Sequence, residues 1–313
     1  MWRPGVSPAC RGVEIDIRDM LTTDEFARTL TYLHALRRDE GGYADQPGNA
    51  RSGLQDTVNV WRALRLLDGT VQDLRGVLTF VQSCFDPRSG GFCERPGAAP
   101  TVLSTALALL LLRGLDDGGG ALAEWRQPAG HFLCEQARSA MDHFLVVAAH
   151  EDGALSLPAP AASLDFFSGL RLPDDTFGDS AFANAIACGA LLRSRGRLPK
   201  PGPIADRLLR AQTAEGGFAD HVGPPDLLTT YAATNALMLL ERPPDLTALK
   251  RYLLALRRHD GAFAMRAGAA GSAGATYHAL AVRAWALRAS ASSAGGGARA
   301  AGASRAGRGS RTA

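Results

Sequence analysis

The stretch EGGFADHVGPPDLLTTYAATNALMLL, residues 215–240, joins a polar, glycine-containing turn and a short Gly/Pro loop to a segment that is apolar on nearly all sides. Glycine supplies the positive φ that ends a helix, and the pair Gly216-Gly217 lets the chain cross close to its neighbours. The aromatic Phe218 can then fill the gap between helices. A helix that is apolar all round, as 230–240 is, belongs in an interior. The stretch therefore predicts a turn that leads into a buried inner helix.

The same order of features recurs along the chain, which is typical of a repeat architecture. The copies are 49 and 45 residues apart toward the two ends of the chain and 63 residues apart on either side of a weaker middle copy. Each copy has a half-polar helix with one apolar stripe, then the turn, then an apolar helix such as 102–112 or 181–192. The turns read EGGY from Glu40, SGGF from Ser89, EGGF from Glu215 and DGAF from Asp260, and a weaker fifth copy is EDGAL at 151–155.

These two kinds of helix predict two layers, because such repeats bury their faces only against neighbouring repeats. We expect an all-α fold, an (α/α) toroid of about five to six helical hairpins with inner and outer helix rings. When the ring closes, the starts of the inner helices surround a central cavity. The expected organisation is an N-terminal extension at 1–23, the toroid domain at 24–288 and a disordered Ala/Gly/Ser/Arg tail at 289–313.

Composition and charge exclude some classes of function. The chain has 313 residues with a net charge of +3, and four arginines lie in the tail, so residues 1–288 are close to neutral. Lysine occurs only at Lys200 and Lys250, and arginine is abundant together with alanine and glycine. We therefore read the arginines as a compositional bias and expect no nucleic-acid partner.

Membrane spans and secretion are not expected either. The longest apolar run, 102–112, is too short to cross a bilayer, and the N-terminus lacks the apolar stretch of a secretory signal. The five cysteines are odd in number and include no Cys-x-x-Cys pair, which favours reduced thiols and a cytoplasmic location.

The repeat resembles that of protein prenyltransferase β-subunits and terpene (squalene) cyclases. The residues that carry the resemblance are FCERPG at 92–97 with the helix 101–112, and GGFAD at 216–220 with DLLTTY at 226–231. It covers roughly residues 24–288. It implies the toroid fold and an isoprenoid ligand, and for the prenyltransferases a helical α-type partner subunit. The fold alone does not decide the chemistry.

Protein prenyltransferases hold a catalytic zinc, which lowers the pKa of a substrate thiol. The resemblance implies Asp and Cys ligands two residues apart at one inner helix and a His at the next. Here Asp226 is followed by Leu228 in place of the Cys, and the two positions that could carry the His hold Thr229 and Ala275. We expect no metal site and no cofactor, with Mg²⁺ left open.

Terpene cyclases of class II carry Asp-x-Asp-Asp-Thr at the start of an inner helix, and LPDDT at 172–176 resembles it. The resemblance implies that Asp174 is a Brønsted acid, with Asp175 raising its pKa. An ordinary acidic helix N-terminus explains the same residues. The chain has room for one helical domain, whereas the cyclase resemblance implies a cavity between two.

Polar side chains on the apolar inner helices are the remaining signal, because a buried polar group needs a partner. Either they bond within the helices, or they line a central pocket together with aromatic residues. They are Asp56, Thr57, Asn59, Ser104, Thr105, Asp179, Ser180, Asn184, Thr229, Thr230, Tyr231, Asn235, Thr276, Tyr277 and His278, and the aromatic candidates are Trp61, Phe182, Tyr231, Tyr277 and Trp285. Arg95, with Arg51 and Arg266, follows a repeat turn and could meet a diphosphate at the rim.

The sequence thus predicts a prenyltransferase-like protein that binds or transfers an isoprenoid diphosphate or another prenyl lipid in a central apolar cavity, without the zinc site. Protonation-initiated cyclisation and a non-catalytic toroidal binding domain are the alternatives. The candidate catalytic residues are Asp174, Asp175 and Asp226. The candidate substrate-binding residues are Asn59, Trp61, Arg95, Asn184, Tyr231, Asn235, Tyr277 and His278.

Overall fold

The computed structural model describes residues 21–115, 123–151, 155, 161–195 and 197–306. Within these ranges the chain forms twelve helices and one two-residue ribbon, in which β1 pairs antiparallel with β2. The elements are α1 (Thr23–Ala35), α2 (Leu54–Leu66), α3 (Leu74–Ser83), α4 (Val102–Leu115), α5 (Ala123–Gln136), α6 (Ala140–Glu151), α7 (Ala161–Gly169), α8 (Ala181–Arg195), α9 (Gly202–Arg210), α10 (Leu227–Leu239), α11 (Leu246–Ala255), β1 (Phe263–Ala264), β2 (Gly271–Ser272) and α12 (Ala273–Ala306).

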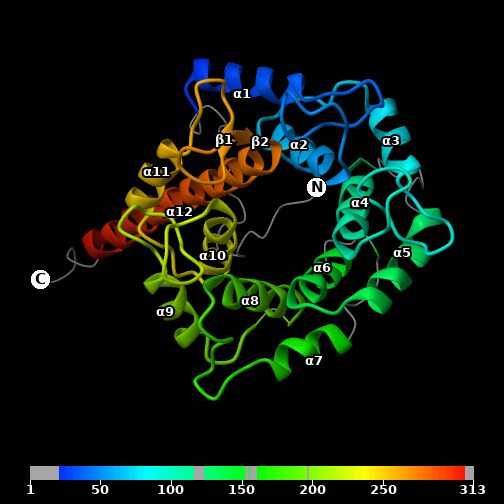
Figure 1. The fold of residues 1–313 in the computed structure, drawn as a ribbon. Helices are drawn as coiled ribbons and strands as arrows, with labels where there is room; N and C mark the ends of the chain where they lie inside the picture. The colour runs from blue at the N-terminus through cyan, green and yellow to red at the C-terminus, as the bar shows by residue number, and fades with distance from the viewer. Residues whose placement is uncertain (1–20, 116–122, 152–154, 156–160, 196, 307–313) are drawn as a thin grey trace, which may run out of the picture.

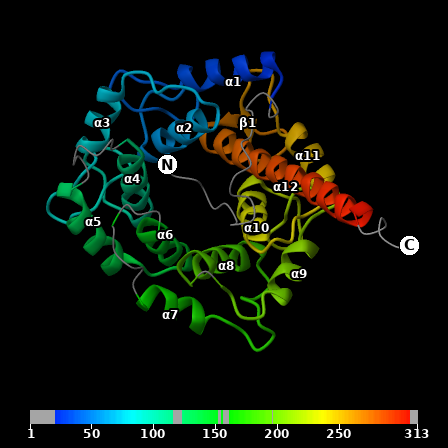
Figure 2. The same ribbon diagram turned by 180° about the vertical axis from the view of Figure 1, so that it is seen from behind.

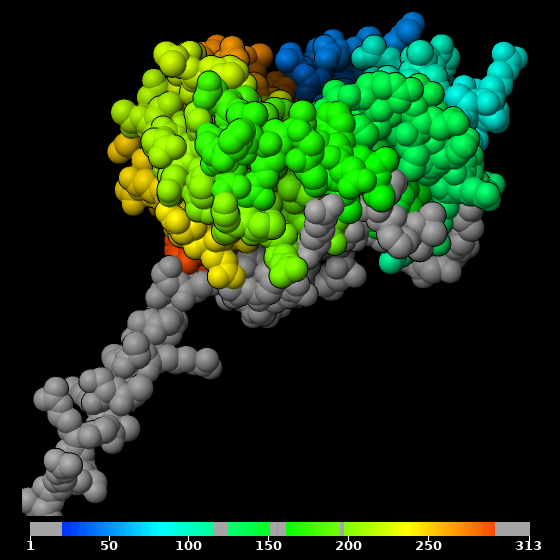
Figure 3. Space-filling model, turned by 90° about the horizontal axis from the view of Figure 1, so that it is seen from below, coloured from blue at the N-terminus to red at the C-terminus, as the bar shows by residue number. Residues whose placement is uncertain are grey.

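The helices alternate between an outer and an inner ring, as Figures 1 and 2 show from the two faces. Odd-numbered helices are outside and even-numbered helices inside, which gives six hairpins. The ring is closed because α12 packs against both α10 and α2. Seen from the side, outer helices and loops form a continuous wall, with segments from the middle of the chain in front (Figure 3). The predicted all-α toroid is confirmed.

Inner helices form the core because their sequences are apolar on every side. In α4 all residues from Leu107 to Leu112 are buried, and most residues of α10, and of α12 as far as Ala289, are buried too. Outer helices bury one stripe only, such as Val77, Phe80 and Val81 on α3. No described helix is long and apolar enough to span a bilayer.

Each of the four predicted turns with an aromatic residue places that residue in the core and fastens it to the inner helix that follows. Tyr43, Phe92, Phe218 and Phe263 are at most 1% exposed. The backbone amide of Phe218 donates a hydrogen bond of 2.9 Å to the Thr230 hydroxyl, which itself donates to the carbonyl of Asp226. The same amide-to-side-chain bond joins Tyr43 to Thr57, Phe92 to Thr105, Phe177 to Asn184 and Phe263 to Thr276. We call this bond the turn lock.

A second repeated bond links four of the six hairpins to the hairpin that follows them in the ring. The first amide of α2 donates to the carbonyl of Glu94 in the neighbouring loop, at 2.9 Å. Equivalent bonds join Ala181 to Asp220, Leu227 to Met265 and Ala273 to Asp45. The last of these closes the ring, because Ala273 belongs to the sixth hairpin and Asp45 to the first.

The first glycine of the turn packs against the next outer helix. Gly216 has φ +98°, and a Cβ there would collide with the backbone carbonyl of Ala248 on α11. Gly41 and Gly261 stand in the same relation to α3 and α1. The positive φ and the close chain crossing that the sequence predicts are both present.

The structure differs from the sequence-based prediction in the middle and at the end of the chain. The expected fifth turn at 151–155 lies mostly outside the described residues, and in chain order it stands between inner helix α6 and outer helix α7 rather than before an inner helix. The turn before α8 is instead at Thr176-Phe177-Gly178. At the C-terminus, α12 continues beyond residue 288 to Ala306, through much of the segment expected to be disordered. Residues 1–20 and 307–313 lie outside the described ranges.

Candidate functional site

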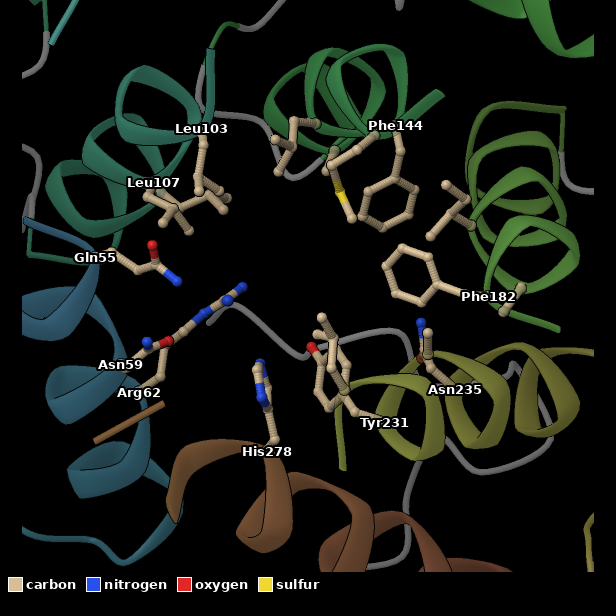
Figure 4. A pocket seen from close by; sticks show the side chains of 18 of the residues that line it. Gln55, Asn59, Arg62, Leu103, Leu107, Phe144, Phe182, Tyr231, Asn235 and His278 are labelled. Atoms are coloured by element: carbon tan, nitrogen blue, oxygen red, sulfur yellow. The ribbon is translucent and has the colours of Figure 1, made fainter. Parts of the chain in front are cut away.

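The inner ring encloses a cavity of about 240 Å³ at the centre of the molecule (Figure 4). All six inner helices contribute to its wall, since each presents one side to the centre of the ring. Its lining is Gln55, Asn59, Arg62, Leu103, Leu107, Leu110, Met141, Phe144, Leu145, Ala148, Phe182, Ala185, Ile186, Arg193, Leu228, Tyr231, Ala232, Asn235 and His278.

Most of this wall is apolar. Leu103 and Leu107 project from α4, Phe144 from α6 and Phe182 from α8 (Figure 4). Leu103 and Leu228 lie in the first turns of their helices and are 37% and 40% exposed, so the cavity is open at the end where these inner helices begin. An apolar pocket with a few polar groups suits a largely hydrocarbon ligand.

The polar groups of the wall include four residues predicted from the sequence: Asn59, Tyr231, Asn235 and His278. Asn235 is 8% exposed, and within the described part of the chain its Oδ1 has no hydrogen-bond partner. The Nδ1 of His278 is likewise without a partner among the described residues. Polar atoms of this kind in a cavity wall are available to a ligand.

Tyr277 lies directly behind the wall and is completely buried. Its hydroxyl is 3.2 Å from the hydroxyl of Tyr231, and the guanidinium of Arg62 lies over its ring, 4.9 Å from the centroid. Burial is the main cause that raises the pKa of Tyr277 well above its ordinary value, so the phenol stays neutral. Trp285 packs behind Tyr231, with ring centroids 5.0 Å apart.

His278 is a neutral member of the wall. Burial, followed by the positive charge of Arg62, lowers the pKa of His278 to about 3. The imidazole therefore acts as a neutral hydrogen-bonding group at physiological pH and adds no charge to the cavity.

Three predicted substrate-binding residues lie elsewhere. Trp61 is 3% exposed and packs between α2 and α4, where a Cβ on Gly114 would strike its indole. The amide of Asn184 is committed to the turn lock before α8, where its Nδ2 donates to the carbonyls of Gly178 and Ser180. Arg95 is exposed in its loop and donates to the Ser52 carbonyl at 3.1 Å.

Asp174 does not have the surroundings that a Brønsted acid needs. It is exposed on the loop between α7 and α8 and does not line the cavity. Hydrogen bonds from the hydroxyl and amide of Thr176, at 2.7 and 3.0 Å, lower the pKa of Asp174 and keep it ionised. A protonated acid requires the opposite shift, so the geometry removes Asp174 from our candidates.

Asp175 and Asp226 also have local structural partners. Asp175 forms ion pairs with Lys200 at 3.0 Å and Arg171 at 3.3 Å. Asp226 is the N-cap of α10, and its two carboxylate oxygens accept from the amide and the hydroxyl of Thr229, each at 2.9 Å. Neither residue lines the cavity.

The residues at the family's zinc positions do not fit a zinc ion. The oxygens of Asp226 are used within its own helix turn, and Leu228, Thr229 and Ala275 offer no imidazole or thiolate. In the described part of the chain no three His, Cys, Asp or Glu side chains are grouped as metal ligands. We therefore derive no step through zinc.

Two carboxyl groups near the start of α2, those of Asp56 and Glu94, have raised pKa values that sequence reasoning did not predict. Burial, together with the nearby charges of Asp45 and Glu94, raises the pKa of Asp56 to about 7. Glu94 accepts from the Gln55 amide at 3.2 Å, and burial raises its pKa as well. Asp56 lies one residue after Gln55 and three before Asn59, both of which line the cavity.

Two arginines are the charged wall residues that the sequence analysis missed. Arg62 and Arg193 occur on α2 and α8, and both line the cavity. In the sequence, each arginine is a charged residue on a helix that the structure places in the inner ring. The general abundance of arginine in this chain concealed it.

Comparison with known families agrees with this architecture. The profile of the prenyltransferase alpha-alpha toroid domain matches residues 57–157 and 182–294, more than half of the chain. The chain belongs to this family. No curated protein matches the sequence significantly.

Solved structures with the same toroid fold include type II terpene cyclases. The apo structure of MstE from Scytonema is 13% identical, with a TM-score of 0.56 over 88% of this chain and 99% of that one. A variant of the same enzyme in complex with merosterolic acid A (product) gives a TM-score of 0.52, 13% identity and coverage of 88% and 98%. Protein geranylgeranyltransferase-I of Candida albicans, complexed with GGPP, is 13% identical over 88% of this toroid and 80% of that chain, with a TM-score of 0.39.

The length of this toroid is therefore no argument against a cyclase. The sequence analysis expects cyclases to need two helical domains, yet the toroid spans 99% of the Scytonema cyclase chain. That expectation does not hold for this solved cyclase chain.

Proposed function

We propose that this toroid binds an isoprenoid chain in its central cavity, as a prenyltransferase-like or cyclase-like member of the family. The observation that carries the proposal is the wall itself, in which apolar side chains from α4, α6, α8 and α10 surround one cavity and α2 and α12 add polar side chains. A hydrocarbon ligand gains roughly 25 cal/mol per Å² of apolar surface that it buries there. The terpene cyclase product bound in one structure of the same fold belongs to the same chemical class.

Binding of farnesol, a C15 isoprenoid alcohol, tests the proposal by isothermal titration. Ala232→Trp should reduce the affinity at least about tenfold, because the indole would occupy the cavity that Ala232 lines. Ala27→Trp is the matched control, since Ala27 is exposed on outer helix α1. Absence of farnesol binding, or equal affinity in the Ala232→Trp variant, would contradict the proposal.

Cyclisation started by protonation is a second candidate, favoured by the raised pKa of Asp56. A carboxyl that titrates near neutral pH can hold the proton that an alkene must receive. Asp56 is in the first turn of α2 and comes between the lining residues Gln55 and Asn59 in the sequence, although it does not itself line the cavity. Asp56→Asn should then abolish turnover of a polyprenyl substrate while farnesol binding persists. Turnover that survives in this variant excludes Asp56 as the acid.

A further inference from the structure

A second cavity, of about 170 Å³, lies between α11 and α12 in the sixth hairpin. Figures 1 and 2 show the two helices side by side, α11 in the outer ring and α12 in the inner ring. The lining is Leu246, Lys250, Leu253, Arg283, Ala286, Leu287 and Ser290. None of these residues lines the central cavity, so the two are separate sites. We call the second one the α11–α12 groove.

The groove follows one face of each helix. Leu246, Lys250 and Leu253 are spaced by four and three residues, which places them on the same side of α11. The lining on α12 runs over the same seven-residue interval, from Arg283 to Ser290. At a rise of 1.5 Å per residue, each interval spans about 10 Å. A cavity of this volume and length suits one extended hydrocarbon chain better than a docked helix, which is about 10–12 Å across.

The groove is apolar apart from two cations. Leu253 is buried, and Leu246, Ala286 and Leu287 are partly buried. The hydroxyl of Ser290 donates to the carbonyl of Ala286 within the same helix, at 3.0 Å. Its donor is therefore already used, and the groups left to recognise a ligand are the charged ones.

Arg283 is a partly buried cation without a counter-ion. In the described part of the chain its guanidinium has no ion pair or hydrogen bond. Burial is the cause that lowers the pKa of Arg283, and no carboxylate opposes it. The positive charge of Arg283 also acts on Arg257, but the carboxylate there, Glu25 of α1, is paired with Arg257 itself. Burying a charge with no partner is costly, and a bound anion would offset the cost.

Lys250 adds a second positive charge at the edge of the groove. It is exposed on α11 and forms no ion pair with any described residue. The lining contains no Asp or Glu. A guanidinium binds a carboxylate through two parallel N–H donors, and the ammonium group can add a third. An apolar floor with two cations and no acid is complementary to an anion that carries a hydrocarbon chain.

We propose that the α11–α12 groove binds a single-chain fatty acid whose carboxylate pairs with Arg283 and Lys250. The hydrocarbon chain lies against Leu246, Leu253 and Leu287. This site is on the outer side of the ring and is independent of the isoprenoid ligand proposed for the central cavity.

Decanoate, a C10 carboxylate, and the neutral decanol test the proposal by isothermal titration at pH 7.5. Wild type should bind decanoate about tenfold or more tightly than decanol. Arg283→Gln should reduce this preference about tenfold and Lys250→Gln about threefold. Arg251→Gln is the control and should leave it unchanged, because Arg251 is exposed on the same helix outside the groove and donates to the Ala214 carbonyl.

A pair of tryptophan variants locates the binding site. Ala286→Trp fills the groove and should reduce decanoate affinity at least about tenfold, whereas Ala232→Trp fills the central cavity and should change it less than threefold. The opposite pattern would place decanoate in the central cavity and overturn the proposal. Absence of decanoate binding, or equal affinity for decanoate and decanol, also overturns it, and neither result bears on farnesol binding. Circular dichroism verifies folding, and the exposed Lys250→Gln decides the outcome where Arg283→Gln does not fold.

Discussion

The fifth hairpin, α9 and α10, and the third, α5 and α6, are built differently although both complete the same ring. The fifth carries the glycine turn, the lock from Phe218 to Thr230 and the carboxylate of Asp220, which accepts from the Phe182 amide at 2.8 Å in the fourth hairpin. In the third, residues 137–139 join the helices directly, and Ser139 with Asp142 caps the start of α6.

What the two hairpins share is an enclosed inner helix. Val146, Val147 and Ala149 of α6 are fully buried, as Ala233 and Leu237 of α10 are. The ring therefore requires apolar inner helices, whereas the turn and its bonds fix how firmly each outer helix and loop is attached. Substitutions in the two hairpins can test this division.

Glycine-to-alanine substitutions should give the largest difference between the two hairpins in the free energy of unfolding. Gly216→Ala should destabilise the protein by about 3 kcal/mol, because the residue has a positive φ and its Cβ would strike the Ala248 carbonyl. Gly130→Ala in α5 should be neutral or stabilise by about 0.5 kcal/mol, since its Cβ makes ordinary contact with Leu155 and helix propensity improves. Urea unfolding measures both. Equal effects would show that the turn is no more constrained than a helix interior.

A smaller effect is expected when the turn lock is removed. Thr230→Val should cost about 2 kcal/mol, because the buried Phe218 amide loses its acceptor. The control is Thr31→Val on the exposed face of α1, where the hydroxyl bonds only to the Ala27 carbonyl, and it should change stability by less than about 0.5 kcal/mol. A Thr230→Val protein as stable as wild type would mean that the lock is dispensable.

The pH dependence of stability should have opposite signs at the two kinds of junction. Asp56, next to the link between the first two hairpins, has a folded-state pKa of about 7, above its unfolded value. The folded state then binds more protons, so this group makes stability fall as pH rises from about 4 to 7. Asp56→Asn should remove that slope and be about 1 kcal/mol more stable than wild type at pH 8, with allowance for partial exposure.

Asp142 of the third hairpin provides the comparison. Burial alone would raise its pKa, but hydrogen bonds from Ser139 and Arg138 outweigh this and lower it. Its stabilisation is present above the unfolded pKa and is lost as the pH falls. Thermal unfolding of Asp142→Asn between pH 3 and 8 should show less loss of stability in acid than wild type. A pH profile of the same sign for both variants would contradict the assignment.

Much of the ring could be predicted from sequence because the turn and the apolar helix are local patterns. Gly216 and Phe218 mark one hairpin, and 102–112 and 181–192 are inner helices as expected. Helix α6 was missed because no glycine turn precedes it. The segment 151–155 was assigned as a turn of the repeat because a Gly-containing stretch that follows an inner helix has the same appearance in sequence as one that precedes it.

The candidate site was harder to predict, since it depends on which side of each helix faces the centre. Asn235 and His278 were found as polar residues on apolar helices. Thr57 and Thr230 gave the same signal but serve the turn lock. Asp174 resembled an acid in sequence, yet only the fold shows that its loop lies outside the cavity.

Closure of the ring sets a condition on synthesis of the chain. Helix α12 covers one side of α2, although its residues follow those of α2 by roughly 200 positions in the chain. A ribosome that adds about 5–20 residues per second needs about 10–40 s to synthesise the intervening chain. During that interval the first hairpins of the nascent chain expose an apolar surface that α12 buries in the folded protein. Until α12 has been synthesised, this surface is a site at which the chain can aggregate or bind a chaperone.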